Sequence, residues 1–91
     1  MSVQTVTGPV AVNDLGRTLM HEHLYIAFSG AEFDSGASFD RSGFVVEAVK
    51  RLTELRVKHG VRTFVDPCPI ELGRDAALMK EIAENSEMNV V

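Results

Sequence analysis

An α/β fold is predicted, because segments with strand patterns alternate with segments with helix patterns along the 91 residues. Apolar residues at 3.6-residue spacing predict one helix over residues 42–59 and a second that ends near Ser86. A β-branched run at 61–65 lies between them, and residues 89–91 begin another strand. Strands separated by helices in this order are expected to run parallel, within one domain over residues 1–91.

The first 24 residues are expected to form a hairpin followed by the first strand of the parallel sheet. Two β-prone runs, Val3–Thr7 and Val10–Val12, are separated by Gly8-Pro9, which favours a turn. After a polar turn, residues 18–24 have the pattern of a strand. The stretch 25–40 is rich in Gly, Ser and Asp and is expected to be a loop, of a length usually connected with function.

The two helices are predicted from their apolar faces and from their ends. Asp40 or Ser42 can accept hydrogen bonds from the free N–H groups that open the first helix, and Gly60 can adopt the left-handed conformation that ends it. Asp75 suits the positive end of the second helix dipole. The apolar faces consist of Val45, Ala48, Val49, Leu52 and Leu55 in the first helix and Leu78, Met79, Ile82 and Ala83 in the second.

The charge balance excludes several classes of partner. Nine Lys and Arg against 13 Asp and Glu give a net charge of −4 without a basic cluster, so neither nucleic acid nor a membrane is an expected partner. No stretch approaches the roughly 18 apolar residues of a membrane span, and the start lacks a signal-peptide pattern, so the expected compartment is cytoplasmic. Cys68 is the only cysteine and is interpreted as a small filler residue.

His21-Glu22-His23 is the one group of residues with a clear chemical rationale. On a strand, His21 and His23 lie on one face, where two neutral imidazoles can bind one metal ion, while Glu22 points the other way. The spacing differs from the helical H-E-x-x-H pattern of zinc proteases. Taken alone, the pair is a weak signal, and two ordinary polar residues that bind no metal are the favoured interpretation.

Two further residues have competing interpretations. His59 is expected to be a solvated residue at the negative end of the first helix dipole rather than a third ligand. Asp66 ends the strand at 61–65, where it can either cap the loop before Pro67 or form a hydrogen bond to a metal-bound histidine.

Two blocks of the sequence resemble the phosphotriesterase family of the amidohydrolase superfamily, which includes related lactonases. The first block comprises residues 5–9 (TVTGP) and 15–24 (LGRTLMHEHL), and the second comprises residues 60–67 (GVRTFVDP) and 72–75 (LGRD). Both occur in the family's order and spacing.

The resemblance implies that the chain is the N-terminal part of a (β/α)₈ TIM barrel, and a fragment of a single metal-dependent hydrolase domain. It implies two divalent metal ions, commonly Zn²⁺, at the carboxyl ends of the barrel strands, bridged by a carboxylated lysine and a hydroxide. His21 and His23 would bind the more buried ion, and the remaining ligands would lie beyond Val91. No catalytic residue is assigned within the 91 residues, so the isolated fragment is expected to be inactive.

The activity expected of the full-length protein is hydrolysis of phosphotriesters, with lactones or carboxylic esters as the alternative. The expected partners are a small-molecule ester and, for the full-length protein, a second copy in a homodimer. Two hypotheses of another class stay open. One is a non-catalytic metal-binding or interaction protein, and the other is a small α/β domain whose histidine pair is buried without metal.

Overall fold

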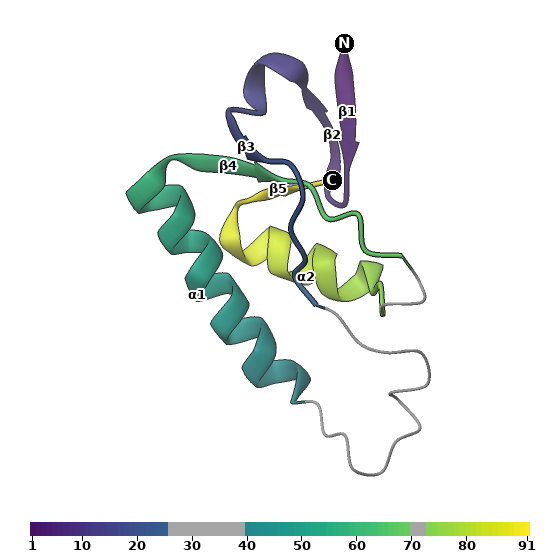
Figure 1. Ribbon diagram of the computed structural model, residues 1–91, viewed down its shortest axis with the longest axis vertical. Coiled ribbons are helices and arrows are strands. Elements are labelled where there is room, and N and C mark those ends of the chain that lie inside the picture. Colours follow the sequence, from purple (N-terminus) through teal and green to yellow (C-terminus); the bar gives the residue numbers. More distant parts are fainter. Residues whose placement is uncertain (26–39, 70–72) are drawn as a thin grey trace.

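The computed structural model describes residues 1–25, 40–69 and 73–91, and its elements alternate in the predicted α/β order (Figure 1). The antiparallel strands β1 (Ser2–Thr5) and β2 (Gly8–Ala11) form a hairpin, which the short 3-10 helix η1 (Val12–Asp14) follows. The remaining elements are β3 (Arg17–Leu19), α1 (Arg41–His59), β4 (Val61–Phe64), α2 (Ala76–Ser86) and β5 (Asn89–Val90). Most of the predicted loop over residues 25–40 lies outside the described residues.

The strands β3, β4 and β5 form a parallel sheet with β4 in the centre, as predicted. Phe64 on β4 lies opposite Leu19 on β3 and opposite Val90 on β5. In the view of Figure 1, both helices lie below this sheet and the hairpin lies above it. The hairpin is attached to the sheet where the Val6 N–H donates to the Val90 carbonyl at 2.9 Å.

The core forms where α1 and α2 pack against each other and against β4 and β5. Its buried members are Leu52, Val61, Phe64, Leu78, Met79, Ile82, Ala83, Met88 and Val90. Other apolar residues of α1, among them Val45 and Val49, pack against this core while partly buried. Burying a large apolar side chain typically contributes about 1.5–3 kcal/mol, so the predicted helix faces account for much of the packing. Neither described helix combines the length and the apolar content of a transmembrane span.

The ends of α1 confirm the predicted caps. Asp40 Oδ1 accepts a hydrogen bond from the Gly43 N–H at 3.0 Å. Gly60 follows the last turn with φ of 68°, and its N–H donates to the Arg56 carbonyl at 3.2 Å. A glycine suits this position because a Cβ is disfavoured in the left-handed region.

Asp75 caps α2 in the same way, because its Oδ1 accepts from the Leu78 N–H at 2.9 Å. We expect Asp75→Ala to lower the free energy of unfolding of the full-length protein by about 0.5–2 kcal/mol, since this N–H loses its acceptor. Asp75→Asn is the control and should stay close to wild type, because Asn caps helices equally well. Chemical denaturation measures both values. An alanine variant as stable as the asparagine variant would contradict the assigned role.

The hairpin turn lies before the predicted Gly8-Pro9 pair. The turn residues are Val6 and Thr7, and Gly8 and Pro9 are the first residues of β2. Gly8 has φ of 121°, which side-chain-bearing residues rarely adopt. Pro9 is tolerated because β2 pairs with β1 alone, and an edge strand does not need every N–H for pairing.

The prediction of a strand over residues 18–24 is wrong beyond Leu19. The Leu19 carbonyl accepts from the Val65 N–H at 2.8 Å, and the Val65 carbonyl accepts from the Glu22 N–H at 3.0 Å. A regular parallel ladder would use the N–H two positions after Leu19, which is that of His21. One extra residue is therefore inserted at Met20-His21, as in a β-bulge, and the alternation of side chains ends there.

Candidate metal centre

His21 and His23 follow β3 at the carboxyl end of the parallel sheet, and their imidazoles lie edge to face. The ring centroids are 5.3 Å apart and the ring planes are perpendicular. His21 is exposed, whereas the His23 side chain is 22% exposed. The predicted proximity of the two rings is confirmed. Its cause differs from the prediction, because a bulged loop rather than strand alternation brings the rings together.

Asp66 lies beside His23, with its carboxylate directed at the loop after β3 that carries the two histidines, here called the histidine loop. Its Oδ1 is 3.1 Å from Nδ1 of His23 and also accepts from the Cys68 N–H at 3.0 Å. Its Oδ2 accepts from the Leu24 N–H at 2.9 Å. The Asp66 side chain is only 1% exposed. Both geometric interpretations of Asp66 are therefore correct, since it caps the loop before Pro67 and contacts a histidine.

The His23–Asp66 contact determines which nitrogen of the imidazole carries hydrogen. An ionised carboxylate only accepts hydrogen bonds, and the Asp66 oxygens already accept from two backbone N–H groups. Nδ1 of His23 is therefore the donor, which leaves the lone pair on Nε2. A neutral imidazole of this form is the one that binds metal ions through Nε2. His23 thus has the chemistry that a metal ligand needs.

Cys68 is a neighbour that the sequence interpretation missed. Its side chain is buried, and its Sγ lies within 4.8 Å of the ligand atoms of His23 and Asp66. Burial raises the pKa of the Cys68 thiol, and the Asp66 carboxylate raises it further, while the Arg74 guanidinium opposes both. The thiol therefore stays protonated at neutral pH and is a poor metal ligand, because metals bind the thiolate. The signal in the sequence was Asp-x-Cys directly after a strand.

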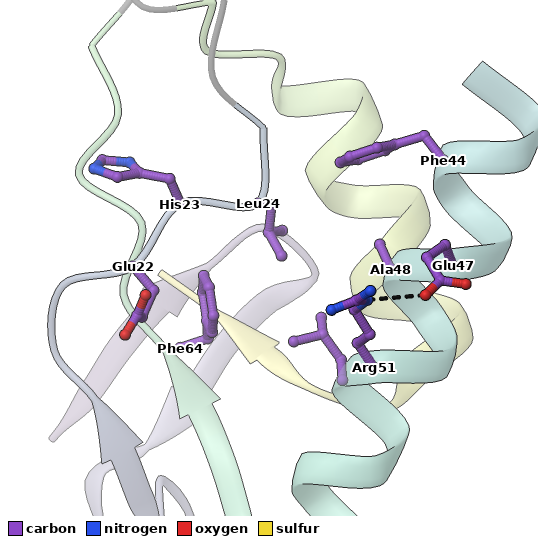
Figure 2. Close-up of a pocket in the computed structure, with 9 residues that line it drawn as sticks. Glu22, His23, Leu24, Phe44, Glu47, Ala48, Arg51 and Phe64 are labelled. Atoms are coloured by element: carbon purple, nitrogen blue, oxygen red, sulfur yellow. Dashed lines mark hydrogen bonds and ion pairs between the residues drawn. The ribbon is translucent and has the colours of Figure 1, made fainter. Parts of the chain in front are cut away.

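A cavity of about 250 Å³ lies on the other side of the histidine loop, between that loop and α1 (Figure 2). It is lined by Glu22, His23, Leu24, Phe44, Glu47, Ala48, Arg51, Leu52 and Phe64. Figure 2 shows Leu24 directed into this space and the His23 imidazole directed away from it. Glu22 points away from the imidazole, as predicted. His23 therefore contributes to the lining of this cavity while its imidazole points out of it.

His59 lies at the opposite end of the sheet, as the last residue of α1. Its side chain is exposed, and its carbonyl accepts from Nη1 of Arg17, the first residue of β3, at 2.8 Å. All three histidines of the chain fall within the described residues, and only His21 and His23 lie together. The predicted position of His59, exposed at the end of the first helix, is confirmed.

The sequence model of the phosphotriesterase family matches residues 1–91. The chain belongs to the phosphotriesterase family. It is 39% identical over 90 residues to the phosphotriesterase homology protein of Mycobacterium tuberculosis, an alignment that covers 98% of this chain and 27% of the relative. It is also 39% identical over 82 residues to the phospho-furanose lactonase of Mycoplasmopsis agalactiae, which covers 90% of this chain and 22% of the relative. The chain thus spans about a quarter of the length of these phosphotriesterase relatives.

A solved structure of the same family confirms the fold. The organophosphorus hydrolase from Deinococcus radiodurans superposes on the whole chain with a TM-score of 0.91 and 32% sequence identity, and the match covers 27% of that structure. The described elements thus correspond to the first part of a phosphotriesterase-like (β/α)₈ barrel. His21, His23 and Asp66 follow the first two barrel strands at their carboxyl ends, where such barrels place their active sites.

Proposed function

We propose that the full-length protein containing this chain is a metal-dependent hydrolase of ester bonds, in which His21 and His23 bind one of two divalent metal ions. The observation that carries the proposal is the pair of adjacent imidazoles after β3, one of which has its Nδ1 3.1 Å from the Asp66 carboxylate. Neutral imidazole nitrogen is a preferred ligand of Zn²⁺, so we propose Zn²⁺ as the metal. The remaining ligands come from outside the 91 residues, which we propose to be the N-terminal part of the single barrel domain.

The chemistry divides between the metal ions and the protein. A pair of divalent ions, when bound, polarises the phosphoryl or carbonyl oxygen of an ester and acidifies a water molecule. Within this chain, His21 and His23 supply two neutral nitrogen donors. Asp66 accepts the Nδ1–H of His23 and so keeps the other nitrogen available. Glu22 points away from the His23 imidazole and is assigned no part in binding the metal.

The proposed substrates are phosphotriesters, and lactones are the second candidate. Similarity to an organophosphorus hydrolase supports the first class, and the higher identity to a phospho-furanose lactonase supports the second. Both classes present an oxygen doubly bonded to the atom that water attacks, so one metal centre can serve either. We propose a small-molecule ester as the partner of this site.

Metal removal tests the proposal in the full-length protein. We expect hydrolysis of a paraoxon-like triester, or of simple lactones, to be lost after treatment with a chelator and to return when Zn²⁺ is added. A His59→Ala variant should behave like wild type through this cycle, because His59 lies at the other end of the sheet. The ratio of kcat/KM for triester and lactone identifies the substrate class. Hydrolysis that persists after complete metal removal would contradict the proposal.

A further inference from the structure

We infer that Asp66 is a positioning residue that selects the metal-binding nitrogen of His23 and fixes the direction of its lone pair. The inference rests on the proposed function, since it assigns how one of the proposed ligands is prepared before metal binds. Asp66 itself touches no metal in this assignment, because its carboxylate is turned toward Nδ1 of His23 and toward backbone N–H groups.

The position of Asp66 is set independently of the histidine. Its backbone N–H donates to the Val91 carbonyl at 2.9 Å, so the hydrogen bonding between β4 and β5 continues beyond Phe64. Its carboxylate is fixed in rotation because each oxygen accepts from a different loop, Oδ2 from Leu24 and Oδ1 from Cys68. The sheet and two backbone groups therefore hold the acceptor in place, and the imidazole aligns to it.

Burial makes this acceptor selective for one form of the imidazole. The Asp66 side chain is 1% exposed, so water does not compete for its oxygens. If the hydrogen of His23 were on Nε2, two lone pairs would face each other across 3.1 Å in a site of low polarity. That arrangement is unfavourable, so the form with hydrogen on Nδ1 is selected. In this form Nε2 points away from Asp66 and is ready to bind.

The two proposed ligands differ in this respect. His21 is exposed, and within residues 1–25, 40–69 and 73–91 no hydrogen bond to its imidazole is found. His23 is therefore the ligand whose orientation is set by the protein, and Asp66 is the residue that sets it. Residues that orient a metal-binding histidine typically contribute about 10–100-fold to metal affinity, which is the effect expected here.

The experiment compares Asp66→Asn with wild type in the full-length protein. Asn keeps the shape but has one acceptor oxygen in place of two, so it cannot accept from Leu24, Cys68 and His23 together, and the preference for hydrogen on Nδ1 of His23 is weakened. In the metal-free protein at pH about 8.5, where an ordinary imidazole is neutral, ¹⁵N NMR should show His23 with hydrogen on Nδ1 in wild type and a shift toward Nε2 in the variant. Zn²⁺ affinity, measured by chelator competition, should fall by about 10–100-fold.

Asp75→Asn is the matched control, because it makes the same change at the partly buried N-terminal cap of α2, without contact to a histidine. It should leave the tautomer of His23 and the Zn²⁺ affinity unchanged. Wild-type His23 with hydrogen on Nε2, or unchanged Zn²⁺ affinity in Asp66→Asn, overturns the inference. The wild-type tautomer decides this even if Asp66→Asn fails to fold. If the wild-type protein binds no Zn²⁺, or binds it no more tightly than the His23→Ala variant does, the proposed function is overturned as well. The two failures are therefore distinguishable.

Discussion

His21→Ala and His23→Ala, each introduced into the full-length protein, are expected to remove one metal ion and to lower hydrolysis by more than about 100-fold. The reason is that each change deletes a proposed ligand, whereas changes that only disturb the orientation of a ligand already cost about 10–100-fold. Metal content by elemental analysis and kcat/KM on the preferred ester measure the two effects together.

Glu22→Gln and His59→Ala are the matched controls for this pair. Glu22 lies between the two histidines in sequence but lines the cavity beside α1, and the side chain of His59 is exposed at the other end of the sheet. Both controls should keep their metal and nearly all of their activity. If both histidine variants retained full metal content and rate, His21 and His23 would not be ligands and the proposed centre would have to be abandoned.

The 91-residue chain by itself is expected to hydrolyse neither paraoxon-like triesters nor lactones above the rate of free metal. Two imidazoles do not complete a binuclear centre, and the chain spans about a quarter of its relatives. Among the described strands, β3 and β5 each pair on one side only, and Val46 and Val57 expose apolar surface on α1. Unpaired parallel edges and apolar surface favour association, so we also expect oligomers or poor solubility.

Hydrolysis assays with added Zn²⁺ and size-exclusion chromatography with light scattering check these expectations. The His21→Ala version of the short chain is the control for adventitious catalysis by metal. Robust turnover by the short chain that His21→Ala abolishes would show that these 91 residues suffice for a working site. A monomer that unfolds in a single two-state transition would contradict the expected association.

Local patterns in the sequence were sufficient to predict the helices and their ends. The apolar spacing from Val45 to Leu55 identified α1, and Asp40 and Gly60 marked its caps because capping depends on neighbouring residues alone. The parallel order of β3, β4 and β5 followed from the alternation of strands and helices. These predictions succeeded because each one rests on interactions within a few residues or on a general rule of chain connection.

The metal site was predictable only in part, because its geometry depends on contacts between distant segments. The adjacency of His21 and His23 was expected, but the bulge that produces it depends on hydrogen bonds to Val65, more than 40 residues away. The loop cap and the histidine contact of Asp66 were each expected as alternatives, but the hydrogen bond from the Leu24 N–H, 42 residues away in sequence, was not. Single-sequence patterns carry no information about such pairing across the sheet.

Because of the extra residue at Met20-His21, the spacing of the two histidine rings is not fixed by the residue repeat of the sheet. On a regular strand, alternate residues are about 6.6 Å apart, and that repeat cannot change without altering the ladder. Here the ladder is restored at Glu22, while the intervening Met20 is 71% exposed and makes no contribution to the core. Substitutions at this one exposed position can therefore adjust the spacing and angle of the two rings while the sheet stays in register. The spacing of the two rings is therefore set by a segment that neither the ladder nor the core constrains.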